Sequence, residues 1–406
     1  MRVATKAKHI GGRQQTEVVR TLHFHCRILE QNLSTDAYAD ALTVVLPIPN
    51  FAAQLHHAAQ ATVSSVRSWS QGLLRSQELG LIVVLLALGT ALTLAAGSHV
   101  DSLSGRTVNN FLNLHTLIQM ATDASAFAIM GVGATIVIIS GGIDLSVGAV
   151  YALAGVAMAM VLRALGPMNP AATVFVGLTS CIAVSVACGL ANGVMVIGLG
   201  VHPFIITLGT MWMVRGVAFV ISHAESILVP VALTHVAKAS LGLGTALYPV
   251  PLLAMITITI VGGVYLKRTV MGRHVFAVGG NAEASRFSGL RIGRIKLGVF
   301  LLSALAAGVA AFIGASFYGS ATSSDANGYE LYVIASAVVG GASLTGGKGS
   351  ALSAMLGAIL IVMIRQAIRT LHLDQNYEWI IIGGAMILAV VLDQGGTRFL
   401  NSFRER

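Results

Sequence analysis

An acid stands inside one of the most apolar stretches of the chain. Residues 140–148 read Ser-Gly-Gly-Ile-Asp-Leu-Ser-Val-Gly, and long apolar runs flank them on both sides. An ionisable group at such a position is costly unless its hydrogen bonds are satisfied. One interpretation is that Asp144 caps the following helix by accepting hydrogen bonds from the backbone N–H groups of Ser146 or Val147. The alternative is that Asp144 or Ser146 hydrogen-bonds a polyol passing through a pore.

The segment Ser-Leu-Thr-Gly-Gly-Lys-Gly-Ser at residues 343–350 suggests phosphate binding at first sight. A P-loop has the form GxxxxGK[ST], but here Ala342 occupies the first glycine position and Gly349 follows Lys348. ATP hydrolysis by this chain is therefore not expected. We expect Lys348 to be a cation at the inner membrane surface, where the chain turns between two helices.

Other catalytic patterns are missing from the sequence. It contains no HExxH, no GxSxG and no cluster of histidines and acids with catalytic spacing. Cys26 lies in a polar leader, whereas Cys181 and Cys188 lie seven apart in one apolar run without a CxxC pattern. We predict no catalytic residue, no metal site and no cofactor in this chain.

The elements that carry these segments are expected to lie in lipid. The 406 residues are 55% hydrophobic and 10% charged, with a mean hydropathy of +0.80, against roughly 25% charged for a soluble domain. The apolar runs are continuous and long enough for helices that cross a bilayer, without the alternation of a barrel strand. The excess of 25 basic over 16 acidic residues is then explained by loops that set topology and meet anionic lipid headgroups, not by nucleic acid.

We predict an all-α, polytopic integral membrane protein with about ten transmembrane helices. Residues 1–76 form a polar, basic extension that is disordered or amphipathic, residues 77–396 the transmembrane domain, and residues 397–406 a cytoplasmic tail. The eighth span is short enough to be a broken or re-entrant element. The predicted spans are residues 79–98, 121–140, 144–163, 172–197, 203–221, 249–266, 297–319, 331–345, 350–370 and 379–392.

Positive charges predict the orientation. The loop between the sixth and seventh spans carries seven Lys and Arg residues against the single acid Glu283, so the positive-inside rule places it in the cytoplasm. Both chain ends then also lie in the cytoplasm. Arg365 and Arg369 run against the rule near the outer end of the ninth span, where they snorkel or face an internal cavity. Glu330, at the outer end of the eighth span, is expected to be an exposed loop acid.

Two parts of the chain share a pattern of residue types that suggests an internal repeat. In residues 126–160 and again in residues 335–364, an apolar segment meets a glycine pair, then a polar residue and a second apolar helix. Such repeats are common in transporters, with broken helices near the repeat interface. The residues predicted to break helices or line a pathway are Gly141, Gly142, Asp144, Ser146, Gly148, Gly340, Gly341, Gly346 and Gly347.

Three segments resemble one known family. GGIDLSVGAVYALAG, beginning at Gly141, is similar to the signature of permeases of the ribose-type sugar ABC transporters, which are related to branched-chain amino acid permeases. MGRHVFAVGGNAEASRFSGLRIGRIK, beginning at Met271, resembles the main cytoplasmic loop of that family, and GYELYVIASAVVGGASLTGGKGS, beginning at Gly328, resembles its late glycine-rich segment. The resemblance covers roughly residues 80–395 and not the first 76.

The cytoplasmic loop suits a docking role by itself. A short helix through residues 282–286, introduced by a turn and cap at Gly279, Gly280 and Asn281, would present small residues to a partner's cleft. The resemblance implies that this is the coupling helix, which inserts into an ATPase subunit. The positions that match the family's coupling loop are Gly272, Arg273, Gly280, Asn281, Glu283, Ala284, Ser288 and Gly289.

The resemblance implies the permease subunit of an importer for a ribose-like monosaccharide. ATP would bind to separate ATPase subunits, a soluble periplasmic or extracellular binding protein would deliver the sugar, and two copies of the chain would form a homodimer in a bacterial inner membrane. Permeases for branched-chain amino acids or nucleosides are an alternative. An ion-coupled secondary transporter is a further alternative, although the spans contain few acids apart from Asp123 and Asp144.

Overall fold

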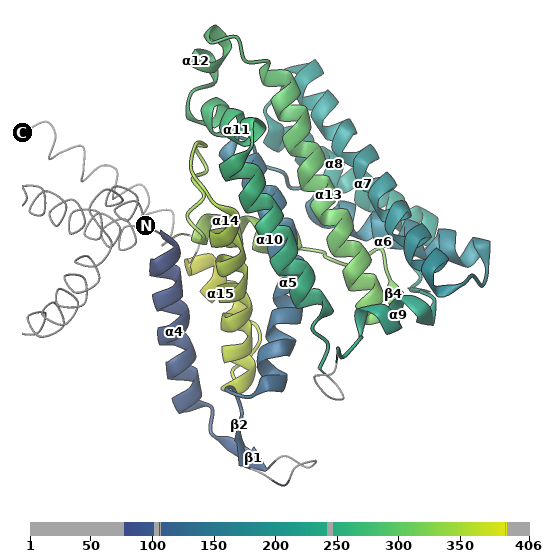
Figure 1. Cartoon of the computed structure of the whole chain (residues 1–406), viewed down its shortest axis with the longest axis vertical. Helices are drawn as coiled ribbons and strands as arrows, with labels where there is room; N and C mark the ends of the chain where they lie inside the picture. The colour runs from purple at the N-terminus through teal and green to yellow at the C-terminus, as the bar shows by residue number, and fades with distance from the viewer. Residues whose placement is uncertain (1–76, 101–104, 106, 242–246, 386, 388–406) are drawn as a thin grey trace, which may run out of the picture. The chain divides into compact units, whose positions relative to one another are not determined.

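The computed structural model describes residues 77–100, 105, 107–241, 247–385 and 387, and Figure 1 shows it to be a bundle of helices. The predicted extension, residues 1–76, and the predicted tail, residues 397–406, lie outside the described residues. Eight helices in the described part are long and apolar enough to cross a membrane, which confirms the all-α polytopic fold. They are α4 (Gln77–Ala95), α5 (Leu114–Ile139), α6 (Val147–Leu165), α7 (Pro170–Leu199), α8 (Pro203–Ser222), α10 (Val250–Arg268), α13 (Ile292–Tyr318) and α15 (Ala351–Thr370).

Shorter elements connect these helices. Two small antiparallel pairs join strand β1 to β2 and strand β3 to β4. The strands are β1 (Ser98–Val100), β2 (Thr107–Asn109), β3 (Ile227–Leu228) and β4 (Ser320–Ala321), and the short helices are α9 (Val231–Ala237), α11 (Val270–Gly280), α12 (Ala282–Phe287) and α14 (Tyr329–Val339). In Figure 1, α11 and α12 lie at one end of the bundle and β1 and β2 at the other. The loop that contains α11 and α12 is the one predicted to be cytoplasmic, and we therefore call the β1–β2 end the outer end.

Eight of the ten predicted spans correspond to the eight long helices, with shifts at their ends. The eighth prediction, residues 331–345, corresponds to α14, which has only 11 residues and is too short to cross a bilayer. The expectation of a broken element there is confirmed. Of the tenth prediction, residues 379–392, the described part is helical through 385, and the rest lies outside the described residues.

Polar caps place the ends of several helices. The side chain of Asn113 accepts a hydrogen bond from the N–H of Thr116 at the start of α5, at 2.8 Å. Asn169 does the same for Ala172 at the start of α7, where Pro170 supplies a backbone angle suited to the first turn. These short polar segments between apolar runs therefore fix where two of the central spans begin.

Helix α5 is the centre of the bundle. In the most apolar stretch of 18 residues of α5, 89% of the residues are buried within the protein, against 11% in the corresponding stretch of α4. Small residues let its neighbours approach: a Cβ added to Gly131 would lie 2.8 Å from the Ser336 hydroxyl, and one added to Gly133 would lie 3.0 Å from the Cα of Ser303. Helices α13 and α14 thus pack directly on α5, and this packing positions the site described next.

Candidate functional site

The first helix break, residues 140–146, joins α5 to α6. Gly141 has a φ of +78°, its N–H bonds the carbonyl of Ile138 at 2.9 Å, and the N–H of Gly142 bonds the carbonyl of Val137 at 3.1 Å. This is the Schellman arrangement, in which a residue with positive φ, usually glycine, ends a helix. The glycine pair therefore ends the helix as the sequence predicts.

The second helix break, residues 340–350, joins α14 to α15 and begins in the same way. Gly341 has a φ of +89° and bonds the carbonyl of Val338 at 2.8 Å, while Ala342 bonds the carbonyl of Ala337 at 2.9 Å. The two breaks thus begin with the same helix-ending motif, and the internal repeat stays a prediction. Because α6 begins at 147 and α15 at 351, the second break is the longer of the two.

Asp144 is held by side chains within the first break. Its carboxylate is 2% exposed and accepts hydrogen bonds from the N–H and hydroxyl of Ser146, at 2.9 and 2.6 Å, and from the hydroxyl of Ser303, at 2.8 Å. The amide of Asn192 in turn donates to the Ser146 hydroxyl at 2.8 Å. The expected bond from the N–H of Ser146 is confirmed. Both carboxylate oxygens are engaged inside the protein, which favours the capping interpretation over direct contact with a polyol.

The two breaks meet each other and the end of α11. The N–H of Gly347 bonds the carbonyl of Ile139 at 2.8 Å. A Cβ added to Gly279 would lie 1.6 Å from that same carbonyl oxygen, and one added to Gly346 would lie 2.7 Å from the carbonyl oxygen of Gly279 and 3.1 Å from the Cα of Gly141. We call Gly141, Gly279, Gly346 and Gly347 the glycine junction. Here three segments touch through backbone alone.

The predicted coupling loop contains the expected short helix, α12. Asn281 caps it by accepting a hydrogen bond from the N–H of Ala284 at 2.9 Å, and Glu283 in its first turn suits the positive end of a helix dipole. The prediction that Gly279 and Gly280 form a turn before it is wrong, because both residues complete α11. Gly279 instead allows α11 to approach the end of α5 and the second break closely.

Most predicted coupling residues lie on the surface. Gly272 is buried, because a Cβ there would lie 2.3 Å from the carbonyl oxygen of Tyr265. Sequence reasoning missed Phe287 at the end of α12, which is 84% exposed. A large exposed aromatic side chain is typical of an anchor for a partner protein. The exposed predicted residues are Arg273, Gly280, Asn281, Glu283, Ala284, Ser288 and Gly289.

Two predicted pathway glycines make room for neighbouring backbone. A Cβ on Gly340 would lie 2.5 Å from the carbonyl oxygen of Ser353, and one on Gly148 would lie 2.6 Å from both the carbonyl oxygen of Ala326 and a carboxylate oxygen of Glu330. Close packing of helices therefore accounts for both glycines.

A buried arginine that the sequence analysis did not single out lies beside Gly148. Arg215 of α8 is 8% exposed and donates to the carbonyl oxygens of Ser323, Asp325 and Ala326, at 2.9, 2.5 and 3.2 Å. It thereby holds the turn that precedes α14. The prediction that Glu330 is exposed is wrong: it is 9% exposed, because α14 begins inside the bundle.

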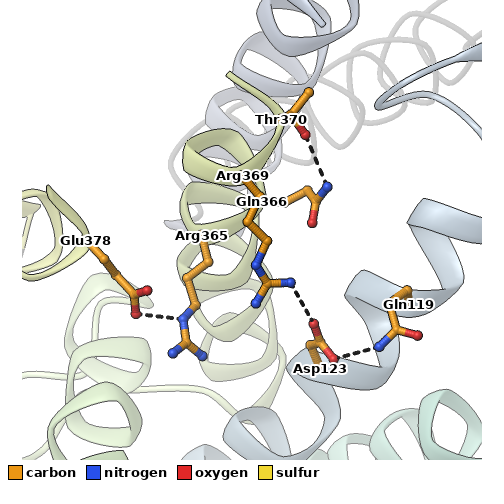
Figure 2. A network of polar contacts seen from close by, with 7 residues as sticks. All are labelled: Gln119, Asp123, Arg365, Gln366, Arg369, Thr370 and Glu378. Carbon is orange, nitrogen blue, oxygen red and sulfur yellow. Dashed lines mark hydrogen bonds and ion pairs between the residues drawn. The ribbon is translucent and has the colours of Figure 1, made fainter. Parts of the chain in front are cut away.

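A polar network occupies the outer end of α5 and α15 (Figure 2). The Asp123 carboxylate accepts a hydrogen bond from Gln119 at 2.9 Å and pairs with Arg369 at 3.5 Å. Arg365 pairs with Glu378 at 2.6 Å. The Arg365 guanidinium also lies over the rings of Phe127 and Tyr332, 5.5 and 5.0 Å from their centroids. Arg365 therefore has its partners within the protein, whereas the side chain of Arg369 is 50% exposed.

Beside this network lies a pocket, which we call the outer cavity. Its empty volume is about 410 Å³, part of which is open to the surroundings. The wall combines a carboxylate, hydroxyl groups and aromatic rings. The lining residues are Thr122, Asp123, Ser125, Ala126, Ile129, Tyr151, Pro251, Ala310, Ile313, Gly314, Phe317, Tyr318 and Tyr329.

Residues 116–390 match the family described as the permease component of branched-chain amino acid transport systems. The chain belongs to this permease family. It is thus a transport component and a multi-pass membrane protein, and the predicted resemblance is confirmed. Within the described residues, no group of three or more His, Cys, Asp or Glu side chains could hold a metal ion.

Several curated relatives of this permease are sugar transport proteins by name. The D-allose transport system permease protein of Escherichia coli is 33% identical over 286 residues, which cover 70% of this chain and 85% of the relative. The ribose import permease protein of Escherichia coli is 33% identical over 289 residues, 70% of this chain and 87% of the relative. The L-arabinose ABC transporter permease protein of Azospirillum brasilense is 32% identical over 316 residues, which cover 78% of this chain and 87% of the relative. No solved structure matches the chain.

Proposed function

We propose that this permease forms the membrane pathway of a bacterial ABC importer that takes up a monosaccharide across the inner membrane. The observation that carries the ABC assignment is the similarity of most of the chain to import permeases, among them one named as an L-arabinose ABC transporter permease. The relatives named for D-allose, ribose and L-arabinose support a sugar as the substrate class, ahead of the branched-chain amino acids in the family description.

The partners follow from the same proposal. Separate ATPase subunits bind and hydrolyse ATP, since the segment at residues 343–350 departs from a P-loop. Each ATPase subunit receives an α12 helix, with Phe287 and Glu283 on the exposed surface that enters its cleft. A soluble binding protein delivers sugar at the outer end, and two copies of the permease form a homodimer around the pathway.

The glycine junction provides a path by which motion of α12 would reach the two helix breaks. Backbone atoms of α11 lie against the carbonyl of Ile139, at the end of α5, and against Gly346 in the second break. Because closely packed contacts transmit displacement instead of absorbing it, a shift of α12 would move both breaks together. Rearrangement of the two breaks would then open the pathway alternately to either side.

The proposal is tested by sugar-stimulated ATP hydrolysis and uptake in proteoliposomes that contain the permease, its candidate ATPase and the binding protein. Glu283→Arg and Phe287→Ala in α12 should abolish the stimulation. Glu225→Arg is the matched control, because Glu225 is also exposed but lies in the turn after α8. Uptake that persists without an ATPase and follows a proton or sodium gradient would instead show a secondary transporter.

A further inference from the structure

From the end of α10 to the start of α13, the chain carries six exposed cations in two groups of three. The sequence holds no acid from residue 226 to residue 282, so the first group has no opposite charge in its own segment. Both ion pairs among the described residues lie at the outer end of the bundle, away from either group. We call the first group, Lys267, Arg268 and Arg273, the α10–α11 cluster, and the second, Arg286, Arg291 and Arg294, the α12–α13 cluster.

The α10–α11 cluster stands at the end of an apolar helix face that the protein leaves uncovered. On α10, Ile256, Ile260 and Val264 are 39, 60 and 52% exposed. Lys267 and Arg268 follow three and four positions after Val264, a spacing that places them on the same face of the helix. In a bilayer such a face is covered by lipid chains, and the cations at its end reach the level of the headgroups.

The α12–α13 cluster has no such face below it. From Ile295 to Phe317, α13 has no exposed residue, because α5, α6 and α7 pack around it. Arg286 belongs to α12 and directly precedes Phe287, which is 84% exposed on the surface assigned above to the ATPase subunit. The two clusters therefore suit different partners, although they carry the same charge.

A tight turn brings Arg273 close to the two cations at the end of α10. The Thr269 hydroxyl donates to the carbonyl oxygen of Tyr265 at 2.6 Å and accepts a hydrogen bond from the N–H of Gly272 at 2.9 Å. A Cβ added to Gly272 would clash with the carbonyl oxygens of Tyr265 and Leu266. The first turn of α11 thus folds back on the last turn of α10, and Arg273 follows directly after this contact.

Apolar side chains lie between the cations. Val270 and Met271, in the first turn of α11, are 56 and 40% exposed. Elements that lie in a membrane interface combine apolar groups, which enter the acyl region, with Lys and Arg, which remain near the phosphates. An acidic protein surface would complement the cations alone, whereas an anionic lipid complements the cations, these two side chains and the uncovered face of α10.

We propose that the α10–α11 cluster binds the phosphate headgroup of an anionic phospholipid whose acyl chains lie along the exposed face of α10. Helix α11 runs from this cluster to Gly279, which lies against the end of α5 and the second break. A bound lipid therefore holds α11 at the glycine junction and raises sugar-stimulated ATP hydrolysis. This effect on hydrolysis rests on the proposed function, whereas the lipid site itself does not.

The first test measures lipid binding to the purified full-length permease by native mass spectrometry, with phosphatidylglycerol and phosphatidylcholine as probes. Wild type should retain phosphatidylglycerol in preference, and loss of the α10–α11 cluster should weaken its binding about tenfold or more. Loss of the α12–α13 cluster removes the same charge and should leave binding unchanged. Equal retention of the two lipids, or equal losses in the two variants, would overturn the site. The variants are K267Q/R268Q/R273Q and R286Q/R291Q/R294Q.

The second test asks whether lipid or a second copy of the chain covers α10. Phosphatidylglycerol with a photoactivatable acyl chain should label peptides of α10 in membranes. In a Cys26→Ser background, Val264→Cys should form no disulfide between copies, because Cys181 and Cys188 lie on α7 and the face of α10 meets lipid. A disulfide between two copies at position 264, without labelling of α10, would overturn the proposal.

The complete importer separates failure of the lipid site from failure of the proposed function. Sugar-stimulated ATP hydrolysis should be several-fold higher in membranes that contain phosphatidylglycerol than in pure phosphatidylcholine, and K267Q/R268Q/R273Q should lose this difference. If this variant also loses stimulation in pure phosphatidylcholine, the cluster contacts the ATPase subunit and the proposal is overturned. If phosphatidylglycerol binds the cluster but sugar never stimulates hydrolysis, the lipid site stands and the ABC assignment fails.

Discussion

At both helix breaks the preceding helix ends with the same backbone hydrogen bonds, but different groups pack into the two breaks. In the first break, buried side chains close the gap, with Asp144 bonded to Ser146 and Ser303. In the second break, residues 340–350, four glycines adopt positive φ and the exposed Lys348 takes no part in a buried network. The first break is therefore closed around a buried carboxylate, whereas the second presents mainly glycine backbone to its neighbours.

This difference matches what each break contacts. The first break packs against α7 and α13, whose Asn192 and Ser303 reach into it. The second break lies against the end of α11, where glycines allow backbone to meet backbone. Two breaks that begin with the same backbone motif are thus closed differently, one by buried side chains and the other by glycine backbone against α11. Four sets of substitutions test this comparison.

The largest effect is expected from Gly279→Ala. A Cβ there would lie 1.6 Å from the carbonyl oxygen of Ile139, and neither backbone can yield without moving a whole helix. Sugar-stimulated ATP hydrolysis should be lost, and thermal unfolding of the purified protein should show destabilisation above about 4 kcal/mol. Gly280→Ala is the control, since nothing lies within 4 Å of its added Cβ. Equal behaviour of the two variants would show that the junction is not tightly packed.

Gly346→Ala and Gly141→Ala compare the two breaks at positive φ. Both substitutions place an L residue in a left-handed conformation, at a cost of roughly 1–2 kcal/mol. At Gly141 nothing lies within 4 Å of the added Cβ, whereas at Gly346 the carbonyl oxygen of Gly279 lies 2.7 Å away. Thermal unfolding should show Gly346→Ala as the more damaging by about 1 kcal/mol or more. The reverse order would argue against contact of the second break with α11.

Asp144→Ala tests the polar core of the first break. It removes the acceptor of three hydrogen bonds and leaves the buried Ser303 hydroxyl without that partner, so we expect about 2 kcal/mol of destabilisation. Lys348→Ala in the second break should change stability by about 0.5 kcal/mol or less, because the lysine is exposed. Both are measured as shifts in thermal unfolding. A larger loss from Lys348→Ala would contradict the comparison.

Apart from that of the exposed Lys348, the smallest effect is expected at the start of α15. Ser350 caps this helix by accepting a hydrogen bond from the N–H of Ser353 at 3.2 Å. Ser350→Ala should cost about 1 kcal/mol, and Ser350→Asn should restore most of it, because asparagine also caps helices. Thermal unfolding of the three proteins decides this. Failure of asparagine to rescue would indicate that the bond from Ser350 to Glu78, at 3.0 Å, is what stabilises this end.

The sequence by itself determined which segments are helices in lipid and where several of them end. Apolar runs of sufficient length leave the backbone no other way to satisfy its hydrogen bonds in a bilayer. The glycine pair at Gly141 and the cap at Asn281 act on residues within one turn, so their roles could be inferred locally. The short α14 could also be anticipated, because its apolar run is shorter than a span.

Only the tertiary structure decided which distant groups meet. Ser303 lies 159 residues from Asp144 and Arg369 lies 246 residues from Asp123, and no local pattern links either pair. The burial of Glu330 and the backbone contact at Gly279 likewise depend on how helices pack, since a glycine or an acid has the same local propensity whether its neighbour is lipid, water or another helix. Sequence periodicity reports the environment of a segment, whereas the identity of its partners is fixed by packing.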